Sequence, residues 1–132
     1  MKRRASLQLI GGGVVFAAAP ALTGCSSDLP AQALQAWEGP GNESDPRRWI
    51  LSYAILAPNS HNLQSWRVDL RQEGLVTLYC DTTRLLPETD PYSRQIMMAQ
   101  GTFLELFDMA AREKGYRTEI DLFPQGVFGP KA

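Results

Sequence analysis

The candidates for ligand chemistry in this sequence lie in one short segment, between Ala57 and Trp66. Five of its residues could contact a ligand: Pro58, Asn59, Ser60, Asn62 and Gln64. The side-chain amides of Asn62 and Gln64 can each donate and accept hydrogen bonds, which suits a planar ligand edge where carbonyl and N–H groups alternate. An ordinary loop between a helix and a strand has a similar composition. The residues alone therefore leave both interpretations open.

Regular elements are predicted on both sides of this segment and must position it. Asp45 is a natural N-cap and Pro46 fits the first helical position, so a helix is expected to begin there and to stop before Pro58. After the segment, residues 66–70 and 75–80 favour two strands joined by the turn at 71–74. The segment is therefore expected to connect a helix to a β-hairpin.

The second half of the chain predicts a long helix and a final strand. Asp90 and Pro91 repeat the Asp-Pro pair, so we expect the longest helix to begin there, and Gly115 provides its stop. Apolar residues on several faces suggest that this helix is central. The alternation from Arg117 to Phe123 predicts a last strand. The expected fold class is α+β, with a hairpin and a further strand packed against the long helix and a shorter N-terminal helix.

The N-terminus predicts export. A basic start with the pair Arg3-Arg4 precedes an apolar stretch at 9–22, an arrangement similar to a twin-arginine signal peptide. The run from Leu22 to Cys25 resembles a lipobox, so we expect a lipid on Cys25, with plain signal cleavage as the alternative. The expected organisation is a signal peptide at 1–24, a tether and loop at 25–44, and a folded domain at 45–132.

Composition and charge exclude several classes of function. The formal net charge is −1, and removal of the basic signal peptide makes the remaining chain more acidic, so no electrostatic footprint for nucleic acid is expected. The chain has a single histidine, His61, and no pair of cysteines near it, which argues against a transition-metal site. Cys80 is expected to be a small buried hydrophobe rather than a nucleophile.

Two stretches resemble a known family. The run Ala57–Trp66 is similar to a segment of the nitroreductase family of FMN-dependent oxidoreductases, in particular of its exported, twin-arginine subgroup. The run from Gly101 to Tyr116 resembles the central helix of that family and its glycine stop. The family usually has proline where this chain has Ser65. Together the two stretches suggest an N-terminal portion of a nitroreductase-like protein.

The resemblance implies a cofactor and a reaction. Members of the family are usually α+β homodimers with FMN at the subunit interface, and they pass a hydride from NAD(P)H to nitroaromatic, quinone or similar acceptors. Carried over, Pro58, Asn59, Ser60, Asn62 and Gln64 would contact the flavin ring or the ribityl chain. No side chain need be a covalent catalyst, because the flavin performs the redox step.

Two departures from the family pattern leave alternatives open. The upstream basic segment that grips the phosphate in the family has no match here, so one of four arginines would have to replace it: Arg47, Arg48, Arg84 or Arg94. Further family segments beyond residue 132 are also missing, which predicts a piece of a longer protein or a reduced form. The alternative function is a non-catalytic envelope lipoprotein that binds flavin or a small hydrophobic ligand, or an interaction protein on a similar scaffold.

Overall fold

A computed structural model of the chain describes residues 29–126. The predicted signal peptide at 1–24 and the predicted lipidation site Cys25 lie outside the described residues. The chain divides into two units, up to Ala33 and from Leu34 onward, and only the second contains the elements that position the candidate site. Within the predicted tether, two short helical segments occur, α2 (Ala31–Leu34) and the 3-10 turn η2 (Gln35–Glu38).

Helix α3 (Pro46–Ala54) confirms the predicted cap. The carboxylate of Asp45 accepts a hydrogen bond of 2.9 Å from the backbone N–H of Arg47, and Pro46 occupies the first helical position. Its missing N–H has no cost there, because the first N–H groups of a helix lack intrahelical partners. The helix ends at Ala54, ahead of Pro58, and buries Ile50 and Ala54.

The predicted hairpin is also confirmed. Strand β1 (Trp66–Asp69) pairs antiparallel with β2 (Thr77–Cys80), and Trp66 lies opposite Cys80. Side chains alternate between the faces of a strand, so Trp66 and Leu78 point to the same side, where both pack against the core. Tyr79 lies on the other face and is exposed. The hairpin therefore has an inner, apolar face and an outer, polar one.

The longest helix, α4 (Arg94–Glu113), begins later than the sequence predicts. Pro91 is not its first residue, because Ser93 precedes the helix with a left-handed backbone (φ 53°). Asp90 still caps the helix, but from four residues upstream of its first residue: its buried carboxylate accepts hydrogen bonds from the N–H groups of Arg94, Gln95 and Ile96. The same Asp-Pro pair thus leads to two different helix starts in one chain.

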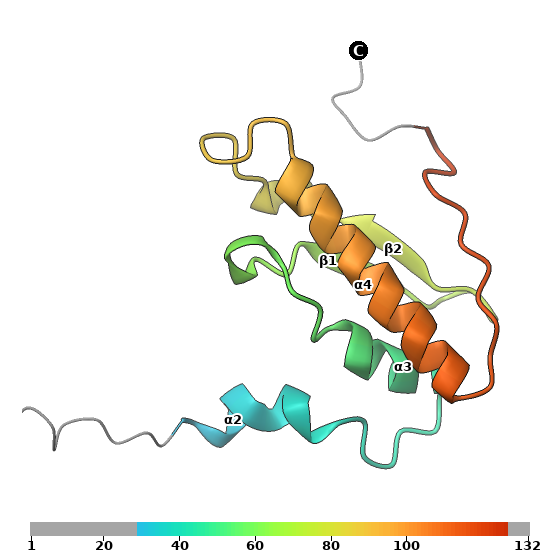
Figure 1. The fold of residues 1–132 in the computed structure, drawn as a ribbon. Helices are drawn as coiled ribbons and strands as arrows, with labels where there is room; N and C mark the ends of the chain where they lie inside the picture. Colours follow the sequence, from blue (N-terminus) through green and yellow to red (C-terminus); the bar gives the residue numbers. More distant parts are fainter. Residues whose placement is uncertain (1–28, 127–132) are drawn as a thin grey trace, which may run out of the picture. The chain divides into compact units, whose positions relative to one another are not determined.

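The core lies where α4 meets α3 and the inner face of the hairpin (Figure 1). Phe103, at the middle of α4, is only 1% exposed and packs against Ala54 and Ala57. Its ring also contacts Trp66 of β1, with centroids 5.0 Å apart. A second cluster joins Ile50 of α3 to the last turns of α4. The described fold is α+β, and α4 has the central place that its apolar pattern predicts.

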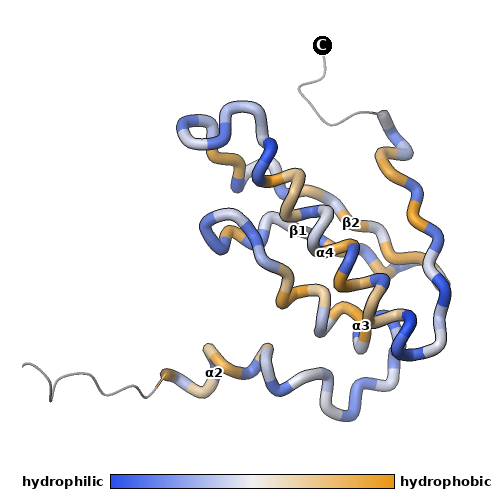
Figure 2. Tube along the Cα trace, viewed as in Figure 1, coloured by the Kyte–Doolittle hydropathy of each residue, from blue (hydrophilic) through white to orange (hydrophobic). Residues whose placement is uncertain are grey.

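The final strand predicted at 117–123 is wrong for the part of the chain that the structure describes. These residues follow α4 as an extended segment without strand pairing, although their hydropathy alternates as the sequence suggested (Figure 2). Ile120 and Leu122 are exposed. The segment is tied to α4 at its start, where the Thr118 hydroxyl donates to Asp108. An alternating pattern does not make a strand without a neighbouring strand to pair with.

Candidate functional site

The predicted ligand segment forms a tight connection between α3 and β1. It contains the 3-10 turn η3 (Ser60–Asn62), and three of its residues have a left-handed backbone: His61 (φ 51°), Asn62 (φ 52°) and Gln64 (φ 48°). None is glycine, and each such conformation costs on the order of 1–3 kcal/mol. Strain of this kind persists only where neighbouring groups hold the backbone in place, so the bonds around the segment matter.

Asn59 holds the segment from within. Its side-chain Oδ1 accepts a hydrogen bond of 2.8 Å from the N–H of Gln64, and its Nδ2 donates to the carbonyl of Ala57 at 3.2 Å. Both ends of this amide therefore bind the protein's own backbone. A ligand contact by Asn59 remains a prediction, and in the structure its side chain closes the loop.

Helix α4 holds the segment from outside at three points. The Thr102 hydroxyl donates to the Pro58 carbonyl at 2.8 Å, and the Ser60 hydroxyl donates to Oε1 of Gln95 at 2.9 Å. Nε2 of Gln100 lies 3.2 Å from both the carbonyl and the hydroxyl oxygen of Ser65. The segment is consequently fixed to a rigid element along its length.

The two side chains with the best predicted chemistry, Asn62 and Gln64, are exposed. They border neither of two open hollows, of about 360 and 590 Å³, which lie along the outer face of the hairpin around Asp69 and Tyr79. A ligand contact by Asn62 or Gln64 remains a prediction, and in the structure both side chains lie at the surface outside these hollows.

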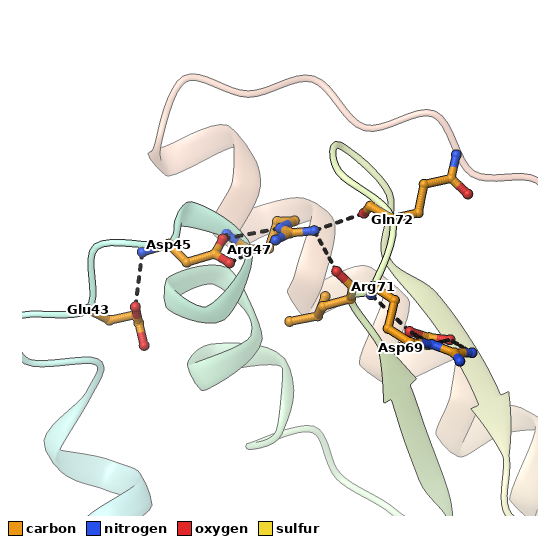
Figure 3. Close-up of polar contacts among 7 residues, drawn as sticks. Glu43, Asp45, Arg47, Asp69, Arg71 and Gln72 are labelled. Carbon is orange, nitrogen blue, oxygen red and sulfur yellow. Dashed lines mark hydrogen bonds and ion pairs between the residues drawn. The ribbon is translucent and has the colours of Figure 1, made fainter.

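Arg47 is bound on both sides by the protein (Figure 3). Its Nη2 lies 2.9 Å from the Asp45 carboxylate, and its Nη1 donates to the carbonyls of Leu70 and Gln72 at 3.0 and 2.9 Å. The hydrogen bond from this side chain is the main reason that the pKa of Asp45 is lowered. Arg47 thus joins the start of α3 to the turn of the hairpin.

The other three arginines predicted as possible phosphate ligands lie in different settings. Arg48 is exposed in the first turn of α3, and Arg94 lies at the start of α4 with its guanidinium carbon 5.1 Å from the centre of the Tyr92 ring. Arg84 alone reaches the candidate segment, where its Nη1 donates to the carbonyl of Leu63 at 2.7 Å and approaches that of Gln64 at 3.4 Å. The structure does not bring the four together.

Sequence reasoning missed a buried polar cluster beside the segment. Ser65 is 1% exposed and Gln100 is 7% exposed, and Nε2 of Gln100 lies 3.2 Å from the Ser65 hydroxyl oxygen. Partial burial, together with the nearby Asp81 carboxylate, raises the pKa of the Cys80 thiol, so this cysteine is a poor nucleophile. A signal for the cluster was present: Gln100 interrupts an otherwise apolar face of α4.

The described part of the chain has no metal-binding cluster, because no group of three or more histidine, cysteine, aspartate or glutamate side chains there could hold a metal ion. No helix among the described residues has the length and apolar character needed to cross a membrane.

Comparison with known proteins identifies distant relatives. The chain is 32% identical over 81 residues to the Mycobacterium tuberculosis protein named "Putative NAD(P)H nitroreductase acg". The matched stretch covers 61% of this chain and 24% of that protein. It is 28% identical over 82 residues to "Putative NAD(P)H nitroreductase Rv3131" of the same organism, covering 62% and 24%. No family model matches the chain, and no solved structure matches it significantly.

These relatives support the nitroreductase resemblance at a coarse level. Their names give NAD(P)H as the reductant and a nitro group as the target of reduction. The chain spans about a quarter of the length of these relatives. The described α+β fold, with its hairpin and long helix, is compatible with part of a nitroreductase-like domain.

Proposed function

We propose that this protein is a flavin-dependent oxidoreductase of the nitroreductase type. In this proposal FMN is the cofactor, NAD(P)H is the reductant, and the acceptor is a nitroaromatic or quinone-like molecule. The described chain contributes residues 58–64 to one edge of the flavin site, and another part of the protein or a second subunit provides the rest. The similarity to proteins named NAD(P)H nitroreductases supports the reaction class.

One structural observation carries the proposal. The segment holds a strained backbone at three residues, and bonds from Asn59, α4 and Arg84 maintain it while Asn62 and Gln64 stay exposed. Because the backbone of the segment is already held in place, binding a planar edge would cost only the conformational entropy of the side chains. Left-handed residues that the surrounding bonds hold in place are concentrated at ligand sites, so this combination supports a ligand role for the segment.

The residues of this chain would position and tune the cofactor. FMN, when bound, supplies the hydride chemistry. The amide groups of Asn62 and Gln64 would donate to the carbonyl groups at the pyrimidine edge, where negative charge collects upon reduction. Asn59 and Arg84 would keep the backbone that carries these groups in place. No described side chain needs to form a covalent bond to the substrate.

The proposal extends to assembly and location. A homodimer would supply the missing walls of the flavin site, since the exposed segment alone forms only one side. The twin-arginine-like signal at 1–24 and a lipid on Cys25 would place the protein in the cell envelope. The twin-arginine route carries folded proteins, which is consistent with loading a cofactor before export.

The test is a double substitution, Asn62→Ala with Gln64→Ala, in the full-length protein. Each lost hydrogen bond is worth about 1 kcal/mol, so we expect the dissociation constant for FMN to rise about tenfold to thirtyfold. Flavin fluorescence during titration measures it. The far-ultraviolet circular dichroism should not change, because neither side chain is buried.

A matched control removes the same two residue types elsewhere. Asn42 and Gln72 are both exposed, in the loop before α3 and in the hairpin turn, so Asn42→Ala with Gln72→Ala should leave FMN binding unchanged. If the Asn62 and Gln64 variant binds FMN as tightly as the control variant, the assigned contacts are wrong. If the unaltered protein binds no flavin, the proposed function is wrong.

A further inference from the structure

Arg84 reaches the candidate segment from the other strand of the hairpin, at the end where Trp66 pairs with Cys80. It is the last residue of the 3-10 turn η4 (Thr82–Arg84), which follows directly after β2. Asp81 caps this turn by accepting hydrogen bonds from the N–H and the hydroxyl of Thr83, at 3.1 and 2.6 Å. The backbone N–H of Asp81 donates to the Ser65 carbonyl at 2.8 Å, so the base of η4 is attached to the segment.

The guanidinium of Arg84 then binds the backbone of the segment itself. Its Nη1 donates to the Leu63 carbonyl at 2.7 Å and lies 3.4 Å from that of Gln64. Its Nε lies 3.6 Å from the Asp81 carboxylate, which orients the side chain. Charged donors make stronger hydrogen bonds than neutral ones, and the planar guanidinium fixes its direction.

The two sides of Gln64 are thereby held by different residues. Asn59 accepts from its N–H, and Arg84 approaches its carbonyl oxygen. Gln64 has a left-handed backbone, which a residue other than glycine adopts only at a cost in energy. Removing either partner would let Gln64 and its neighbours relax into a more common conformation.

We propose that Arg84 is a positioning residue for the ligand segment and not a ligand of the flavin phosphate. Arg84 holds Leu63 and Gln64 so that the side chains of Asn62 and Gln64 face the flavin. This inference rests on the proposed function. The distinction matters because the family resemblance leaves the phosphate ligand open among four arginines, and Arg84 is the one whose guanidinium binds this backbone.

Comparing FMN with riboflavin separates the two roles, because riboflavin has the same ring but no phosphate. A positioning residue affects the ring site, so Arg84→Ala should weaken both ligands by the same factor, about threefold to tenfold for a half-exposed charged hydrogen bond. Arg84→Lys should weaken both as well, since an ammonium group cannot reproduce the planar donor. Flavin fluorescence during titration gives both dissociation constants.

Arg71 provides the matched control. Its side chain is 91% exposed in the hairpin turn, and its guanidinium binds only Asp69 among the described residues. Arg71→Ala removes the same charge and should change neither dissociation constant. If Arg84→Ala weakens FMN but not riboflavin, or if it weakens neither, Arg84 is not a positioning residue and the inference is overturned.

A second measurement needs no flavin. Amide hydrogen exchange across residues 61–65 should be faster in the Arg84→Ala variant than in the unaltered protein, while residues of α3 and α4 keep their protection. The Arg71→Ala variant should exchange like the unaltered protein. Unchanged exchange at 61–65 in Arg84→Ala would overturn the inference, whereas a protein that binds no flavin but shows the faster exchange would reject only the proposed function.

Discussion

At the scale of single residues, the most unusual feature is a buried pair of polar side chains, Ser65 and Gln100. The Gln100 amide donates to Ser65, but its Oε1 is buried without a hydrogen-bond partner. Buried polar groups are nearly always paired, because an unpaired one keeps the full cost of leaving water. The pair therefore links α4 to the start of β1, but it leaves one buried acceptor without a hydrogen bond.

This imbalance predicts that two substitutions at the pair will not be additive. Ser65→Ala alone should lower the free energy of unfolding by about 1 kcal/mol, because the Gln100 amide loses a partner. Adding Gln100→Met removes the buried amide, including its unpaired Oε1, so the double variant should be no less stable than Ser65→Ala. Urea denaturation of the single and double variants measures this. Strictly additive losses would contradict the proposed dependence of one side chain on the other.

At the scale of elements, the start of α4 depends on one side chain. Asp90 is 6% exposed, and its two carboxylate oxygens accept three backbone hydrogen bonds of 2.8, 2.9 and 3.1 Å. These N–H groups have no partner within the helix, and a negative charge at a helix N-terminus is also favoured by the helix dipole. No other described side chain caps this end.

Asp90→Ala should therefore destabilise the fold by about 2 kcal/mol, as expected for a buried cap with charged hydrogen bonds. Asp90→Asn, which keeps an acceptor but not the charge, should lose less. The midpoint of urea denaturation is the measurement, and Glu88→Ala, in the exposed turn just before Asp90, is the control. Equal stability of the Asp90→Ala and Glu88→Ala variants would show that the cap does not stabilise the folded state.

Elements that follow a standard local pattern were predictable from the sequence, and those that depart from it or need a further partner were not. The Asp45 cap binds an N–H two residues away, and the hairpin has an alternating stretch on each side of a short turn, so both were predicted correctly. The start of α4 was wrong because Asp90 reaches over a turn that places Ser93 in the left-handed region. The strand at 117–123 was wrong because pairing needs a second strand, which a local pattern cannot supply.

At the scale of the whole folded unit, α3 and the hairpin are joined by charged groups. Arg47 links the Asp45 carboxylate to the carbonyls of Leu70 and Gln72, which lie 23 and 25 residues after Arg47 in the sequence. At the hairpin turn, Arg71 binds Asp69. The hydrogen bond from Arg71 lowers the pKa of Asp69 to about 2, and that from Arg47 lowers the pKa of Asp45. Folding therefore favours the charged form of both carboxylates.

A consequence for acid stability follows. An aspartate whose pKa is lower in the folded state stabilises that state at pH values above its unfolded pKa of about 3.9, and this contribution is lost as the pH falls toward the folded value. We expect the urea midpoint to fall between about pH 4 and pH 2. Arg47→Gln should make this fall smaller, because Asp45 then loses the side-chain hydrogen bond that lowers its pKa most. An unchanged pH profile in Arg47→Gln would contradict the link.

The candidate site was predictable as a segment but not as an arrangement. Its residue types indicated amide chemistry near 58–64, yet nothing local showed that Arg84 would reach its backbone. That contact depends on how η4 packs beside the loop. The roles of Pro58, Asn59, Ser60, Asn62 and Gln64 toward a ligand remain predictions that the binding experiments address.

The three attachments of α4 to the loop have one more implication. Gln95, Gln100 and Thr102 hold it at Ser60, Ser65 and Pro58, so the loop cannot shift independently of the helix. The stripe of α4 that carries Gln95 and Thr102 also displays the exposed residues Met98 and Met109, which lie three and seven residues after them. A molecule that bound to those methionines and rotated the helix would also move the loop. By thermodynamic reciprocity, a ligand bound to the loop would then change the affinity of the helix for that molecule.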